Sequence, residues 1–383
     1  MRSQLLRATA VAAGALVLGA AGWSMATRAQ AAPAAESRDA LTRGFSKGAW
    51  DHQSIGPLAF SPSGVLFFAD DQAGAIYGVD LAETRSQAAP YARVPELGAT
   101  LAARLGTTPA GIEIKDLAVS PVSHAVYLSV RKTDGADNNP ADPANYALFS
   151  VAPSGEITAV DLASKPFARV SLNAAKGRDP RLVTDLAYAK GRLLVASLSK
   201  EQFDSNLISV PVPFNGGVER FATSIYHVSH KRQETASPIQ TLTVYRDGDR
   251  EYLMAAYVCT PVVRFNLDDL KPGATVTGVT VAELGSQNRP MAMVAYGDPG
   301  KQSLLLNNSR FGVLKVDRKI AMETSAVNEK TTADRGDRGM TPFPGIEAVE
   351  SLKDARAYTA ADRQLLVVKP TDGGMSLEPM PLP

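Results

Sequence analysis

The stretch "PLAFSPSGVLFFADDQAGAIYGVDL", from Pro57 to Leu81, decides the fold. Apolar and polar residues alternate along it, and a Ser-Pro-Ser-Gly turn divides it. β-Branched and aromatic residues fill many of the apolar positions, which favours short strands joined by tight turns over a helix. A unit this small needs neighbours to bury both of its faces, so the same pattern is expected elsewhere in the chain.

The pattern recurs, and six segments open with a similar first strand. They begin at "PLAFSPSG" (Leu58), "DLAVSPVS" (Leu117), "DLAYAKG" (Leu186), "TLTVYRDG" (Leu242), "AMVAYGDPG" (Met293) and "AVESLKD" (Val349). Each is followed by a second and a third apolar strand, which in the sixth segment are "ARAYTA" and "QLLVVKP". A fourth, outer strand is expected in each unit, for example in "EITAVDLA" from Glu156.

Radial stacking of six such units predicts an all-β chain folded as a six-bladed β-propeller. A seven-bladed ring and a pair of β-sandwiches are the alternatives. We expect the segment near "SKGAW", residues 46–50, to close the ring by pairing with the last blade.

The N-terminus carries an export pattern. Arg2 and Arg7 precede an apolar stretch from Ala8 to Trp23, and Ala29-Gln30-Ala31 fits a cleavage site. We therefore expect a signal peptide over 1–31, a flexible mature N-terminus over 32–45 and the propeller over 46–383. An uncleaved membrane anchor is the alternative. The expected route is the general secretory one, to the periplasm or the extracellular space.

Composition excludes several classes of protein. The 383 residues are 45% hydrophobic and 21% charged, which suits a folded chain with one large all-β domain. The net charge is +1 and no long basic run stands out, so nucleic acid is not expected as a partner. No apolar run after the signal is long enough to span a bilayer.

The "A-x-S-P-x-G" and "I-x-x-V-D" patterns of the blades resemble those of six-bladed propellers of the NHL, YWTD and regucalcin/gluconolactonase kind. The resemblance covers Gln53 to about Gly374. It implies that ligands bind where the innermost strands begin and where second strands turn into third strands. The gluconolactonase-like proteins carry a metal-binding Glu before a Gly-Pro, and here "SIGP" has Ile55 at that place.

Candidate site residues follow from this placement. Carboxylates converging on one axis repel each other unless a cation or an arginine lies among them. Oxygen ligands suit a divalent ion, so calcium, manganese, zinc or magnesium is the candidate cofactor. The candidate metal ligands are Glu113, Asp116, Asp185, Asn307 and Glu347. The candidate ligand-binding residues are Asp71, Asp204, Asn206, Arg289, Arg310 and Asp362.

In the alternative interpretation, these acids pair with Lys115, Arg289 or Arg310, or accept hydrogen bonds from strand-end amides. Asp185 is also the candidate catalytic acid. His227 and His230 are spaced to chelate a metal on a helix, but the chain has four histidines and one cysteine, which argues against a His-rich site. Cys259 lies in an apolar run, which indicates a buried, inert thiol.

Two classes of function remain. The first is an extracytoplasmic binding or scaffold propeller that recognises a small polar ligand, a glycan or a partner protein at the mouth of its channel. The second, implied by the resemblance, is a metal-dependent hydrolase of lactones or esters. A third class, a quinoprotein-like dehydrogenase subunit, is disfavoured because the sequence has no haem-attachment motif and two tryptophans.

Overall fold

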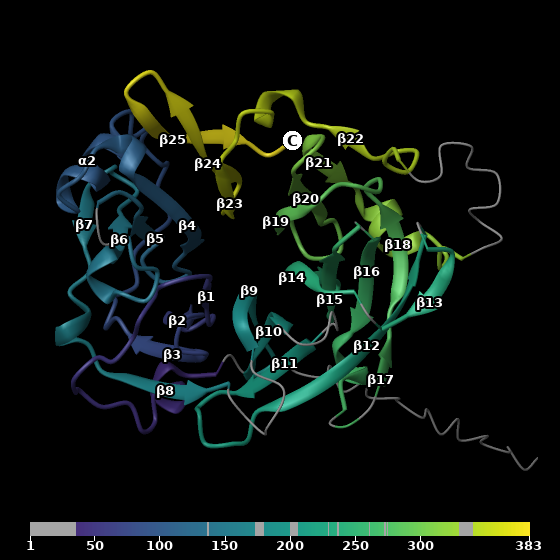
Figure 1. Cartoon of the computed structure of the whole chain (residues 1–383), viewed down its shortest axis with the longest axis horizontal. Coiled ribbons are helices and arrows are strands. Elements are labelled where there is room, and N and C mark those ends of the chain that lie inside the picture. Colours follow the sequence, from purple (N-terminus) through teal and green to yellow (C-terminus); the bar gives the residue numbers. More distant parts are fainter. Residues whose placement is uncertain are drawn as a thin grey trace, which may run out of the picture. The chain divides into compact units, whose positions relative to one another are not determined.

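The computed structural model describes residues 36–135, 138–172, 180–199, 206–228, 230–235, 237–259, 261–271, 273, 275–328 and 340–383. In these residues the strands form six sheets arranged in a ring (Figure 1). The predicted all-β, six-bladed propeller is therefore confirmed. The expected signal peptide, 1–31, lies outside the described residues.

Blades are numbered by the order of their inner strands along the chain, and each runs from its inner strand outward. The first contains β1 (Leu58–Phe60), β2 (Val65–Asp70), β3 (Ala75–Asp80) and β8 (Phe167–Ser171). The second contains β4 (Ile112–Val119), β5 (Val126–Lys132), β6 (Tyr146–Val151) and β7 (Ile157–Ala159). The third contains β9 (Pro180–Ala189), β10 (Arg192–Ser199), β11 (Asn206–Pro211), β12 (Glu219–His227) and β13 (Arg232–Glu234), with β17 (Thr275–Thr277) parallel to β12.

The fourth blade contains β14 (Ile239–Asp247), β15 (Arg250–Tyr257), β16 (Pro261–Asn266) and β18 (Val279–Glu283). The fifth contains β19 (Pro290–Tyr296), β20 (Ser303–Asn308), β21 (Gly312–Val316) and β22 (Glu347–Ala348). The sixth contains β23 (Ala357–Ala361), β24 (Gln364–Thr371) and β25 (Gly374–Pro381). Short helices connect the strands: α1 (Arg38–Leu41), α2 (Leu97–Arg104), η1 (Pro109–Gly111), η2 (Pro143–Asn145), η3 (Leu162–Ser164), η4 (Leu267–Asp269), η5 (Lys319–Glu323) and η6 (Glu350–Leu352).

The inner strands β1, β4, β9, β14, β19 and β23 face one another around the axis (Figure 1). Because neighbouring strands within each blade are antiparallel, the starts of the inner strands share one end of the ring with the connections between second and third strands. We call this end the upper face. The turns between first and second strands lie at the opposite end, the lower face.

The first two blades exchange places around the ring. β1 packs between β4 and β9, and β4 has β23 of the last blade as its other neighbour. The ring order is therefore second, first, third, fourth, fifth, sixth (Figure 1). After the second blade is complete, the chain returns through β8, which pairs with β3 as the outer strand of the first blade.

Ring closure differs from the prediction. Ser46 forms its bridge with Phe167 in the first blade, so residues 46–50 do not close the ring on the last blade. Val94, in the connection between the first and second blades, pairs instead with Leu377 on the outer edge of β25. The sixth blade is also shifted by one strand, because "ARAYTA" forms its first strand and not its second.

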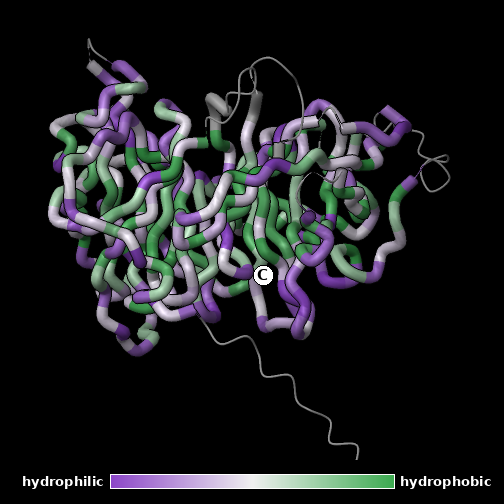
Figure 2. Tube along the Cα trace, turned by 90° about the horizontal axis from the view of Figure 1, so that it is seen from below, coloured by the Kyte–Doolittle hydropathy of each residue, from purple (hydrophilic) through white to green (hydrophobic). Residues whose placement is uncertain are grey.

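Apolar side chains from adjacent blades pack into clusters between the sheets, and one cluster joins the third and fourth blades through Leu194, Leu207, Leu253 and Phe265. Figure 2 shows hydrophobic segments running along the strands and hydrophilic segments at many of the connecting turns. Burial of both faces explains the near-continuous apolar runs in second strands such as β2, in which every residue is buried. None of the helices in the described residues is long and apolar enough to cross a membrane.

Candidate functional site

The two axial aspartates hold the inner strands together. Asp116 on β4 accepts a hydrogen bond from the Leu58 amide of β1 at 2.7 Å and another from the Leu117 amide at 2.8 Å. It therefore links the second blade to the first. These strand amides face the axis, where no further strand can pair with them, so a short acceptor side chain satisfies them.

Asp185 makes the equivalent link between the third and fourth blades. Its carboxylate accepts hydrogen bonds from the amides of Leu186 and Leu242 at 2.8 and 2.9 Å, and from the Thr241 hydroxyl at 2.5 Å. Both aspartates thus take the arrangement of the alternative interpretation, in which main-chain amides satisfy the acids. Whether a cation also binds on the axis stays a prediction.

Burial changes the protonation of both groups. Burial, together with the nearby charge of Asp185 and opposed by the two amide hydrogen bonds, raises the pKa of Asp116 to about 7. Burial likewise raises the pKa of Asp185 to about 6, opposed by its three hydrogen bonds. The state in which Asp116 and Asp185 are both ionised is therefore disfavoured near neutral pH.

The other predicted residues of the upper face are engaged locally. Glu113 pairs with Lys115 at 3.3 Å, and Asp71 accepts a hydrogen bond from the Ser54 hydroxyl at 2.7 Å. The Arg310 guanidinium donates to two carbonyls and lies over Phe311, with 5.1 Å to the ring centroid. Arg289 is exposed just before β19, and Asn307 is buried on β20.

Two predicted placements are wrong, for one reason. The expected sixth blade began one strand too early, so Glu347 was placed on an inner strand and Asp362 on the upper face. Glu347 lies on β22, the outermost strand of the fifth blade. Asp362 lies in the turn between β23 and β24 at the lower face, 3.4 Å from His124. Asp204 and the side chain of Asn206 lie outside the described residues.

A second cluster lies on the upper side of the junction between the third and fourth blades. β12 ends at His227, and the turn after it carries His230. The short strand β13 pairs back onto β12 and places Glu234 opposite Ile225. Cys259 comes from the fourth blade, in the turn between β15 and β16, with the left-handed φ of +60° that a side chain rarely adopts.

These residues bring two imidazoles and a thiol together. His227, His230 and Cys259 each offer one ligand atom, and the three atoms lie within 4.8 Å of one another. The imidazole centroids are 4.1 Å apart. Nδ1 of His230 lies 2.9 Å from Glu234 Oε1, and Nδ1 of His227 contacts the same oxygen.

The charge of Glu234 fixes the tautomers. Although burial opposes it, the hydrogen bonds from His227 and His230 hold the pKa of Glu234 below its usual value, so this carboxylate is ionised and can only accept. Each Nδ1 must then donate, so the neutral form of either ring would have its lone pair on Nε2. Nε2 of His227 is buried and makes no well-formed hydrogen bond among the described residues, and the Cys259 main chain lies close to the ring. Burial lowers the pKa of His227, which favours this neutral form.

The thiol is protonated in these surroundings. Burial raises the pKa of Cys259, and the charges of Glu283 and Glu234 raise it further. Such a thiol is a poor nucleophile, because the thiolate is the reactive form. The same negative surroundings attract a cation, and a bound cation would reverse the effect on the thiol.

Sequence reasoning considered the histidine pair and the cysteine separately and missed the cluster. The signal that joins them is structural, because Cys259 reaches the histidines only through the packing of two blades. A local cue existed in Glu234, four residues after His230, a spacing that lets one carboxylate orient an imidazole.

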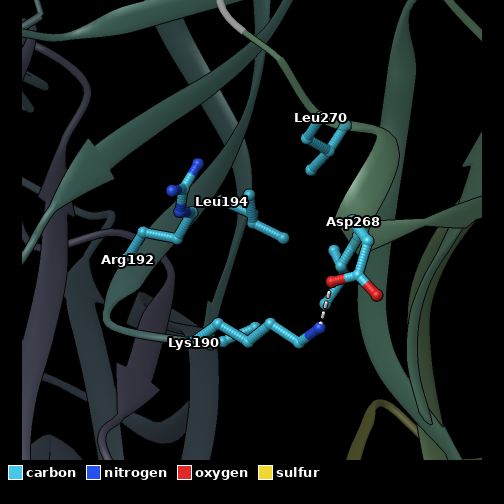
Figure 3. Close-up of a pocket in the computed structure, with 7 residues that line it drawn as sticks. Lys190, Arg192, Leu194, Asp268 and Leu270 are labelled. Carbon is cyan, nitrogen blue, oxygen red and sulfur yellow. Dashed lines mark hydrogen bonds and ion pairs between the residues drawn. The ribbon is translucent and has the colours of Figure 1, made fainter.

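A pocket of about 220 Å³ lies at the lower face between Lys190 and η4 (Figure 3). Leu194 and Leu270 give it apolar walls, and the Lys190 ammonium points to the Asp268 carboxylate, 2.5 Å away. Arg192, the other cation of the pocket, lies 3.6 Å from Glu219. Both cations are therefore neutralised from within, which leaves the cluster at Cys259 as the stronger candidate site.

Comparisons with known proteins do not identify a family. No protein-family model matches the sequence, and a search of curated proteins finds no match. A virginiamycin B lyase from Staphylococcus aureus is 11% identical, with 85% of this chain and 94% of that chain covered and a TM-score of 0.37. The Malassezia sympodialis allergen Mala s 1 is also 11% identical, with 86% and 92% covered and a TM-score of 0.38. These values are too low for any argument, and the six-bladed arrangement rests on the sheets themselves.

Proposed function

We propose that this chain is an exported binding propeller that holds a transition-metal ion, zinc(II) by preference, between its third and fourth blades. The observation that carries the proposal is one ionised carboxylate, Glu234, that orients two imidazoles whose ligand atoms lie within 4.8 Å of the Cys259 sulfur. Export is proposed from the N-terminal signal pattern alone.

The donor set selects the ion. Two neutral imidazoles and a thiolate are borderline to soft ligands, which suit zinc and exclude calcium and magnesium as good occupants. Metal-binding histidines characteristically donate their second nitrogen to a carboxylate, and this is the arrangement of Glu234 with His227 and His230. Of the four ions expected from the sequence, zinc fits best.

Electrostatics supports a cation here. The Glu234 and Glu283 carboxylates act on the thiol of Cys259, and their charges favour a metal ion at the site. Binding would release the thiol proton, so affinity for zinc should rise with pH. A metal bond to the buried Nε2 of His227 would satisfy a lone pair that makes no well-formed hydrogen bond among the described residues.

The lactonase-like alternative depends on a different centre. It requires an ion on the axis, where Asp116 and Asp185 accept main-chain hydrogen bonds and where Ile55 replaces the family's glutamate. No observation favours that reaction over binding, and we do not adopt it.

The test is the metal content of the mature protein, without a histidine tag, by elemental mass spectrometry after desalting without a chelator. We expect about one zinc per chain. The Cys259→Ser variant should lose it, because a hydroxyl is a poor zinc ligand. Glu234→Gln should weaken zinc binding by about 10- to 100-fold, since the neutral amide lacks the negative charge that strengthens the hydrogen bonds from both imidazoles.

The matched control is His124→Asn. His124 lies at the lower face with a φ of +59°, a conformation that Asn tolerates. Zinc content should be unchanged in this variant. A wild-type protein that remains metal-free after incubation with excess zinc would refute the proposal, as would equal zinc content in the wild type and Cys259→Ser.

A further inference from the structure

We infer that the metal ion keeps one exchangeable coordination position, open to solvent beside His230, which binds a small monodentate anion such as a carboxylate. This inference rests on the proposed function above. An ion with an open position can bind a ligand, whereas an ion closed by four protein ligands would only hold two blades together.

The number of protein ligands indicates an open coordination position. Among the described residues, the group of mutually close ligand atoms contains three members, His227, His230 and Cys259. Structural zinc sites are closed by four protein ligands, whereas sites with three keep the fourth position for water or an external ligand. Glu283 acts on the thiol as a nearby charge but is not a member of this group.

Burial sets the direction of the open position. The side chains of His227 and Glu234 are 1% and 6% exposed, and Glu283 is fully buried. His230 is 43% exposed. Protein therefore closes the inner side of the ion, and the free coordination position points outward past His230.

Charge sets the class of ligand. Two neutral imidazoles and one thiolate leave a net charge of +1 among the zinc ion and its ligands, which favours an anion over a neutral base; the Glu234 and Glu283 carboxylates outside this group offset part of that preference. The Arg232 guanidinium is 69% exposed and has its Nε 3.2 Å from Glu234 Oε2. Lys231 beside it is exposed as well. These cations at the outer edge would attract an anion toward the ion and disfavour cationic ligands.

The experiment uses cobalt(II) in place of zinc, because its visible spectrum reports coordination. Cobalt is bound to the intact mature protein, and azide and then acetate are titrated against the ligand-field bands. We expect saturable spectral shifts with both anions. Arg232→Gln should weaken azide binding by about two- to fivefold, the effect of one exposed charge, when both proteins are compared at saturating cobalt. Arg363→Gln, at the lower face, is the matched control and should behave like the wild type.

The two proposals fail in different ways. A cobalt–thiolate spectrum that high azide and acetate concentrations leave unchanged would overturn the open position and leave the metal site standing. A protein that binds no cobalt would overturn the metal site itself, and this inference with it. Loss of azide binding in Arg363→Gln but not in Arg232→Gln would refute the assigned direction of the open position.

Discussion

The protein should lose stability as the pH rises from 5 to 8, the reverse of the usual loss of stability in acid. Replacing Asp116 by asparagine should remove this pH dependence. Asp116 links β4 to β1 through the Leu58 amide, and burial raises its pKa from 3.8 to about 7. The neighbouring Asp185 adds to that shift. Asparagine has nearly the same shape but cannot titrate, so Asp116→Asn isolates the protonation of this one group.

The raised pKa of Asp116 decides whether stability rises or falls with pH. The folded state binds the Asp116 proton more tightly than the unfolded state, so protonation stabilises the fold. This stabilisation is fully present below the unfolded pKa near 4 and is lost as the pH rises through 7. Between pH 5 and pH 8 the loss amounts to about 2–3 kcal/mol in the free energy of unfolding.

Urea unfolding at pH 5, 6, 7 and 8 measures this difference. Asp116→Asn also loses one hydrogen-bond acceptor, which lowers its stability by a similar amount at every pH. The informative quantity is therefore the difference in the free energy of unfolding between wild type and variant, which should be largest at pH 5 and shrink by about 2–3 kcal/mol toward pH 8. Asp298→Asn, at an exposed turn, is the control. A gap that stays constant over this range would refute the assigned burial and coupling of the axial pair.

Three further predictions concern the links between blades. Asp185→Ala removes the acceptor for the Leu242 amide, so urea unfolding should show the free energy of unfolding lowered by about 2–4 kcal/mol. Zinc content should not change in this variant, and loss of the metal would favour an axial ion. Gly278→Ala would place a Cβ 2.3 Å from Val263, so a loss of about 1–3 kcal/mol is expected, with Gly217→Ala, in open space, unchanged. Val94→Pro removes the amide that donates to Leu377 and should lower the melting temperature more than Val94→Ala; equal effects would contradict ring closure at this residue.

The first five blades could be predicted from the sequence because their strands carry a local signal. Apolar runs and turns such as Ser-Pro-Ser-Gly depend on residues close together in the chain. The sixth blade was shifted because "AVE" reads like the start of an inner strand, whereas only Glu347 and Ala348 form a strand there, as the short outer strand β22. Periodicity gives the length of a strand and does not say which blade it joins.

The order of the blades and the cluster at Cys259 could not be predicted for a related reason. Both depend on which blades become neighbours. Because the repeat pattern is nearly the same in every blade, it does not indicate which blades lie side by side. Asp116 and Asp185 lie on the inner strands β4 and β9, but their hydrogen bonds to Leu58 and Leu242 depend on the register between blades, which the sequence does not indicate. The same register brings Cys259 to the two histidines of the preceding blade.

The exchanged order of the first two blades has a consequence for how the chain assembles. The second blade is built from one continuous segment, Ile112 to Ala159, and can form as soon as that segment is available. The first blade needs β8 as its outer strand, so its sheet stays incomplete until Ser171 has been synthesised. A chain synthesised from its N-terminus therefore completes its second blade before its first. Until β8 pairs with it, β3 remains an unpaired edge strand.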